Sequence, residues 1–113
     1  MGVPFRLNRR LDLEEAVPIS DGAGGYSMNW VRLGTHWAAM KYGTGREAAG
    51  EDVSQSLVSL RIIVRASPHG AVSRPKAGQR FVEGPRIYRV VAVSDVQEDN
   101  RYLTCFAKEE VLK

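Results

Sequence analysis

Apolar and polar residues alternate with a period of two through most of the chain, and helical periodicity is nearly absent. Segment 57–65 shows the pattern most clearly, with one apolar face and one face of serine and arginine. The apolar face is formed by Val58, Leu60, Ile62 and Val64, and Ile63 alone breaks the alternation. Such a strand lies at the wall of a core, with its second face in water or against a partner.

The same alternation, bounded by turn-forming residues, predicts five further strands, at 10–19, 29–42, 80–83, 86–94 and 102–108. We therefore predict an all-β, mostly antiparallel fold: a small six-stranded β-barrel or sandwich with long loops and at most a short helical turn. Strand 29–42 would be roughly 45 Å long if fully extended. It must curve to stay paired in so small a domain, and Gly34 predicts a bend or bulge within it.

The segments between the strands are polar and rich in glycine and proline. Residues 21–25 predict a flexible turn, 97–100 a hairpin turn, and 67–78 an irregular connection. Residues 43–56 have no strand pattern, so we interpret them as a long, mostly exposed loop, of a kind that is often functional. The tail, 109–113, is too short for an element of its own.

A length of 113 residues and an apolar content of 43% fit one domain, 1–113, with a single core. No apolar run approaches the roughly 20 residues that a bilayer requires, so we expect no membrane partner. The N-terminus lacks the apolar segment of a signal peptide, which favours synthesis in the cytoplasm. The net charge of +3 is low for a dedicated nucleic-acid binder, because 13 acidic residues are interspersed among 16 basic ones.

The residues that could carry chemistry do not form a recognisable set. Cys105 is the single cysteine and lies among apolar strand residues, which predicts a buried, inert thiol. His36 and His69 are far apart in sequence, have no identifiable catalytic partner, and cannot form a usual metal site with one cysteine. The glycine-rich segments match neither a dinucleotide-binding motif nor a P-loop. We therefore expect a protein without catalytic residues, metal or cofactor, which is not an enzyme.

The aromatic and basic residues each admit two interpretations. The aromatic residues could stack on single-stranded nucleic acid, as in an OB-fold, but their spread over all strands favours the core. They are Trp30, Trp37, Tyr42, Phe81, Tyr88, Tyr102 and Phe106. The basic residues form either a solubilising surface paired with Glu and Asp, or contacts with other subunits or DNA. They are Arg46, Arg61, Arg65, Arg74, Lys76, Arg80, Arg86 and Arg89.

A collinear series of motifs covers nearly the whole chain. It comprises Leu7–Leu11, a strand that begins with Trp30 and contains Thr35–Ala39, the loop Gly43–Glu47, the strand Arg61–Arg65, the hairpin Gly84–Val90 and a closing strand with Tyr102 and Leu103. In order and spacing this series resembles the head–tail joining, or head-completion, family of long-tailed phages and of gene transfer agents, which are prophage-derived particles of bacteria.

The resemblance implies a non-enzymatic β-barrel in the virion, assembled in the bacterial cytoplasm. Six or twelve copies would form an adaptor or stopper ring, with the portal or adaptor ring above and the tail terminator or tail tube below. The ring would join head to tail and retain double-stranded DNA in its channel. The alternative function is an OB-like nucleic-acid-binding barrel, and salt-dependent binding of short DNA by the monomer would favour it.

Two loops are the candidate interface sites under this resemblance, because glycine-bracketed polar segments can project and move at modest cost. The candidate channel loop, within 43–56, contains Thr44, Gly45, Arg46, Glu47, Glu51 and Asp52. The second candidate docking loop, within 18–28, contains Asp21, Gly22, Gly24 and Gly25. Arg46 and Glu47 would face each other between subunits, since a ring needs two different patches on each copy.

Overall fold

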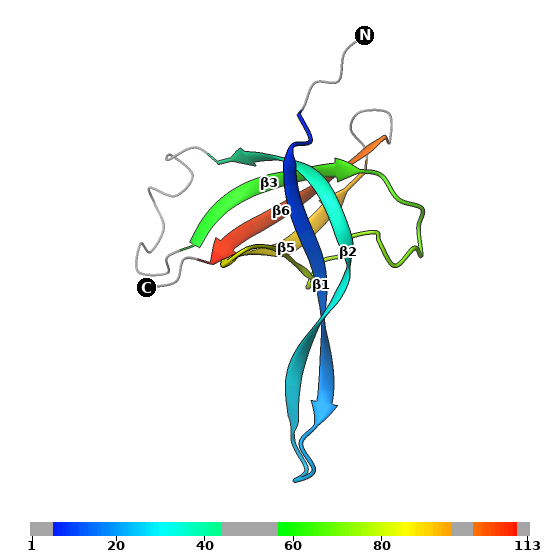
Figure 1. Ribbon diagram of the computed structural model, residues 1–113, viewed down its shortest axis with the longest axis vertical. Coiled ribbons are helices and arrows are strands. Elements are labelled where there is room, and N and C mark those ends of the chain that lie inside the picture. The colour runs from blue at the N-terminus through cyan, green and yellow to red at the C-terminus, as the bar shows by residue number, and fades with distance from the viewer. Residues whose placement is uncertain (1–5, 44–56, 96–100, 111–113) are drawn as a thin grey trace.

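The computed structural model describes residues 6–43, 57–95 and 101–110, which form six strands. These are β1 (Arg9–Ser20), β2 (Tyr26–Tyr42), β3 (Leu57–Arg65), β4 (Arg80–Glu83), β5 (Arg86–Ser94) and β6 (Tyr102–Glu110). Every pair of neighbours is antiparallel, and the order β1-β2-β3-β6-β5-β4 closes into a barrel because β4 pairs back onto β1 (Figure 1). The predicted six-stranded, antiparallel all-β fold is confirmed.

The strand boundaries differ from the prediction at two places. β2 begins at Tyr26 rather than at 29, because its pairing with β1 continues to the last pair, Ser20 with Tyr26. The predicted loop 18–28 is therefore mostly strand, and only 21–25 forms the turn. Glu109 and Glu110, predicted to lie in the tail, belong to β6, because both β3 and β5 extend far enough to pair with them.

β1 and β2 continue past the barrel wall as a two-stranded ribbon, residues 15–31, which we call the arm (Figure 1). β4 pairs with β1 only from Asp12 to Glu14, so beyond that point β2 is the strand to which β1 is paired in the described part of the chain. From Glu14 to Ser20, the ribbon extends by roughly 20 Å at the usual rise per residue. The arm is thus a hairpin of two paired strands rather than an irregular loop.

A β-bulge lies where the arm leaves the barrel. Leu13 pairs with Gly34 and Glu14 with Arg32, which leaves Leu33 as the extra residue. Gly34 has a φ of +156°, a conformation that residues with a Cβ rarely adopt. The bulge predicted at Gly34 is confirmed, and a bulge increases the local twist that turns the ribbon out of the barrel wall.

The core is formed by inward-facing residues of the barrel strands. Its most buried members are Leu11, Leu13, Ala38, Leu60, Ile62, Val64, Phe81, Tyr88, Val90, Leu103, Cys105 and Ala107. Cys105 is buried as predicted, and desolvation raises the pKa of its thiol to about 12, so the reactive thiolate is scarce at neutral pH. The prediction for the aromatic residues is only partly right, because Trp37 is 56% exposed and Phe106 39%.

Candidate functional site: a packed barrel with a projecting arm

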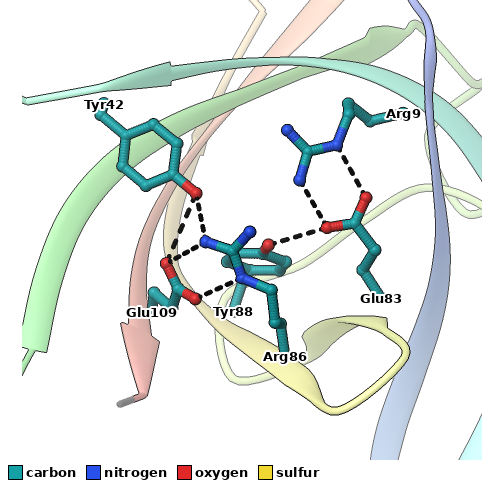
Figure 2. A network of polar contacts seen from close by, with 6 residues as sticks. All are labelled: Arg9, Tyr42, Glu83, Arg86, Tyr88 and Glu109. Carbon is teal, nitrogen blue, oxygen red and sulfur yellow. Dashed lines mark hydrogen bonds and ion pairs between the residues drawn. The ribbon is translucent and has the colours of Figure 1, made fainter.

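At one end of the barrel, inward-facing polar side chains form a network of hydrogen bonds and ion pairs, which we call the polar lid (Figure 2). Its members are Arg9, Tyr42, Glu83, Arg86, Tyr88 and Glu109. On one side of the lid, Arg9 donates two hydrogen bonds to the Glu83 carboxylate, from Nε at 2.7 Å and Nη2 at 2.5 Å. The fully buried Tyr88 donates its hydroxyl hydrogen to the same carboxylate at 3.0 Å. Glu83 therefore joins β1, β4 and β5.

On the other side of the lid, Arg86 donates to Glu109 from Nε at 2.7 Å and from Nη2 at 3.0 Å. Its Nη2 also donates to the Tyr42 hydroxyl at 2.7 Å, and that hydroxyl lies 3.4 Å from Glu109 (Figure 2). The hydrogen bond to Glu109 is the main cause that raises the pKa of Arg86. This half of the lid ties the end of β2 to β5 and β6.

Ionisation in the lid follows from these contacts. The hydrogen bond from Arg9 is the main cause that keeps the pKa of Glu83 below its ordinary value, so its carboxylate is charged at neutral pH. Burial, followed by the bond to Glu83, raises the pKa of Tyr88, so its hydroxyl stays protonated and can donate. The formal charges of the two arginines and two glutamates in this partly buried network balance.

The connection 66–79 packs against the barrel near His36. Pro75 is fully buried, and Arg74 Nη1 donates to the Ser67 carbonyl at 2.7 Å, while its Nη2 lies 3.2 Å from Asp95. His36 Nε2 lies 2.7 Å from the carbonyl oxygen of Ser73, and burial lowers the pKa of His36. The connection is irregular as predicted, and its contacts explain His36 as a residue that fastens it.

The described interior is therefore filled by packed side chains, with a polar lid at one mouth. Within the described ranges, no group of three or more His, Cys, Asp or Glu residues could hold a metal ion. The same part of the chain has no helix long and apolar enough to cross a membrane. The surfaces that can serve a partner lie on the outside of the barrel and on the arm.

The structure places the second candidate docking loop at the tip of the arm. Asp21 Oδ1 accepts hydrogen bonds from the backbone amides of Ala23 at 2.8 Å and of Gly25 at 3.1 Å. These bonds lower the pKa of the exposed Asp21 carboxyl, so the tip carries a negative charge at neutral pH. Gly22 and Gly24 have positive φ angles of 80° and 86°, which glycine adopts without a steric cost. The candidate channel loop, from Thr44 to Asp52, lies outside the described residues.

The sequence interpretation missed the exposed apolar surface of the arm. Ile19 is 46% exposed, Tyr26 74%, Met28 58% and Val31 40%. A signal was available, because segments of similar length and apolar content flank the glycine-rich turn on both sides. Such a strand–turn–strand pattern indicates a hairpin. An exposed apolar strand pair commonly marks a site of contact with another molecule.

Side chains of β4 and of the segment before it hold the base of the arm in place. The Arg80 guanidinium lies 4.0 Å above the ring of Trp30, and its Nε donates to Glu14 at 2.8 Å. The Gln79 side-chain amide donates to Glu15 at 3.0 Å. Stacking of a guanidinium on an indole stabilises by about 0.5–1 kcal/mol at an exposed site. These contacts fix the position at which the arm leaves the barrel.

Four of the basic residues named in the sequence analysis form ion pairs within the chain, as the first interpretation expects. Ion pairs join Arg74 to Asp95, Arg80 to Glu14, Arg86 to Glu109 and, at 3.5 Å, Arg89 to Glu110. By contrast, Arg61 and Lys108 form no ion pair with any residue that the structure describes. A contact of either residue with an anionic partner stays a prediction.

Comparisons with known proteins agree with this architecture. The family model for phage head completion protein matches residues 4–110. A chain from the virion of a native gene transfer agent particle is 49% identical, covers 96% of this chain and 98% of its own, and superposes with a TM-score of 0.75. Protein SF1141 from Shigella flexneri 2a superposes with a TM-score of 0.70, covers 99% of this chain and 100% of its own and, at 19% identity, shows the shared fold alone. No curated protein matches the chain.

Proposed function

The chain belongs to the phage head completion protein family, and from this premise we propose that it is a non-enzymatic connector that joins head to tail and retains packaged DNA. The resemblance found in the sequence is confirmed, and the chain is a head completion protein of a phage or gene transfer agent particle. The connector would be a ring of six or twelve copies, between the portal or adaptor ring and the tail.

The observation that carries this proposal is the projecting arm on a barrel whose interior is filled. A barrel of six strands has no room for DNA, because side chains occupy its lumen. A DNA channel would therefore run between copies. Ring closure requires two different patches on each copy. The arm and the outer barrel wall supply two such patches.

We propose that the chain is not an enzyme, because neither its candidate nucleophile, Cys105, nor its candidate base, His36, is arranged for catalysis. Cys105 is buried with a raised pKa, and His36 is engaged with the carbonyl of Ser73. Neither arrangement provides an activated nucleophile with an oriented base. Segment 43–56 stays the proposed channel loop, with Arg46 and Glu47 as its proposed contact between subunits.

The test shortens the arm without disturbing the barrel. Ala16 and Trp30 lie opposite each other, so replacing residues 17–29 by Asn-Gly closes the ribbon with a two-residue turn and keeps Trp30 against Arg80. We expect a folded protein, by circular dichroism and urea unfolding, but few tailed particles in electron micrographs and less nuclease-protected DNA. Val72→Ser, which removes an apolar side chain that is 67% exposed and lies outside the arm, is the matched control.

Normal numbers of tailed, DNA-filled particles with the shortened arm would contradict the proposal. A second variant separates the two loops: residues 44–54 are replaced by a short Gly-Ser linker. If the segment closes the channel, these particles should join tails yet lose DNA. Particles that retain DNA normally would remove this segment from the proposal and leave the arm's role intact.

A further inference from the structure

The outer wall of the barrel carries a row of like charges on adjacent strands. Arg80 on β4 pairs in register with Arg89 on β5, and Arg89 pairs with Lys108 on β6. Like charges directly opposite each other destabilise a sheet. Ion pairs with Glu14 and Glu110 reduce the repulsion at Arg80 and Arg89, respectively. No described residue forms an ion pair with Lys108. Among the residues that the structure describes, the row is therefore incompletely neutralised.

Two hollows on this wall join the charged row to apolar residues. One, of about 580 Å³, is lined by Trp30, Arg80 and Arg89 among others. The second, of about 290 Å³, is lined by residues that include Arg61 and Phe106. They share Val91 and Lys108 and so form one continuous surface, which we call the basic groove; its members are Arg61, Arg80, Arg89, Val91, Phe106 and Lys108.

The apolar members of the groove lie open to solvent. Val91 is the extra residue at a register shift of β5, between the pairs made by Val90 and Ala92, and it is 54% exposed. Phe106, which pairs with Ala92, is 39% exposed. A partner that fits the groove must therefore offer both negative charge and apolar side chains.

The arm has this combination. Residues 15–31 contain two acidic residues, Glu15 and Asp21, and no lysine or arginine, although the whole chain is basic. The charged Asp21 lies at the tip, and the four exposed apolar residues of the arm lie behind it. Trp30, at the base of the arm, lines the larger hollow of its own chain. The rest of the arm points away from the barrel (Figure 1).

We propose that the arm of one copy docks in the basic groove of the next copy, with Asp21 toward the cations and the apolar arm residues against Val91 and Phe106. The occupant of the groove is therefore a second copy of this chain. Because arm and groove are different patches, the contact repeats head to tail and closes a ring when the rotation allows. This contact rests on the proposed ring function and names its interface.

DNA is the other anion that a basic surface could attract, but the groove does not favour it. Glu110 lines the larger hollow, and Glu14 occupies the Arg80 end of the row. Both carboxylates would repel phosphate oxygens. Val91 and Phe106 would lie against the charged backbone, which gives apolar side chains no favourable contact. The apolar arm matches them instead.

The test places a photoreactive benzoylphenylalanine at Tyr26, an aromatic position that is 74% exposed on the arm. The full-length variant is the sole copy in cells that produce particles, and purified particles are irradiated. We expect covalent dimers on a denaturing gel. After trypsin, the cross-linked partner peptides should be 90–101, which contains Val91, or 102–108, which contains Phe106. The same probe at Val72 should give no dimer.

A charge-reversing substitution tests whether the basic groove is the docking site of the arm. Lys108→Glu in the Tyr26 probe variant should lower the dimer yield about tenfold or more, because like charges at an interface cost several kcal/mol. Arg65→Glu makes the same charge change on β3, outside either hollow, and should leave the yield unchanged. Equal yields in both charge variants would overturn the assignment of the groove.

The outcomes separate this inference from the proposed function. Particles that contain the chain but give no dimer, or a cross-link to another polypeptide, to DNA or to peptides outside the groove, overturn the inference alone. A chain missing from purified particles overturns the proposed function itself. Dimers joined through the predicted peptides support both.

Discussion

Glu83→Gln tests whether the polar lid stabilises the barrel at its shortest seam. β4 has only four residues, and it meets β1 in three pairs, from Asp12 to Glu14. The Arg9–Glu83 pair joins the same two strands at the barrel mouth. Glu83 accepts three hydrogen bonds, two from Arg9 and one from Tyr88. Glutamine keeps one acceptor oxygen, loses the charge, and turns an amide N–H group toward existing donors.

The expected cost follows from these contacts. Loss of a hydrogen bond to a charged group costs about 1.5–3 kcal/mol, and an exposed ion pair contributes about 0–1 kcal/mol. The side chains of Arg9 and Glu83 are 34% and 26% exposed, so the pair lies between these cases. We expect the free energy of unfolding to fall by about 2 kcal/mol. With a typical urea m-value, the unfolding midpoint should drop by about 1–2 M.

The pH dependence gives the expected sign. Arg9 holds the pKa of Glu83 below its ordinary value of 4.5, so the stabilisation is present above that pH and is lost as the pH falls through the lowered pKa. The difference in unfolding free energy between the wild type and Glu83→Gln should be largest near neutral pH. It should shrink below about pH 4. Urea titrations followed by circular dichroism at both pH values measure it.

Glu110→Gln is the matched control, because it makes the same chemical change in a looser pair. Glu110 lies 3.5 Å from Arg89, whose side chain is 62% exposed. Loss of this ion pair should lower the free energy of unfolding by no more than about 0.5 kcal/mol. If Glu83→Gln costs no more than Glu110→Gln, or if its effect is the same at low and neutral pH, the lid does not stabilise the barrel as described.

Three further predictions address the core, the thiol and the base of the arm. Ile62→Ala empties a fully buried site and should cost about 2–5 kcal/mol in urea unfolding; a cost below 1 kcal/mol would refute close packing there. Cys105, with a pKa of about 12, should resist a thiol reagent at pH 8 until urea unfolds the chain; rapid labelling of the native protein would contradict its burial. Arg80→Ala removes the contacts to Glu14 and Trp30, so hydrogen exchange should speed up in the arm and not in β6; unchanged exchange in the arm would show that Arg80 does not brace it.

Much of the fold was readable from local sequence pattern. Period-two alternation is a property of neighbouring residues, so it predicted the six strands, the core face of β3 and the buried Cys105. Gly34 predicted the bulge because a residue without a Cβ can take the conformation found there. The collinear motifs, which no single contact explains, indicated the family that the comparison confirms.

The pairings that close the barrel were decided only by tertiary structure. Arg9 and Glu83 meet across 74 positions of sequence, and no local pattern specifies such a contact. The same holds for the arm: alternation stays the same whether a strand has two neighbours or one, so sequence did not separate the 15–31 ribbon from the barrel wall. Short-range chemistry sets strands and turns, whereas the registers between distant strands determine which polar groups meet, which apolar residues stay exposed and where a partner can bind.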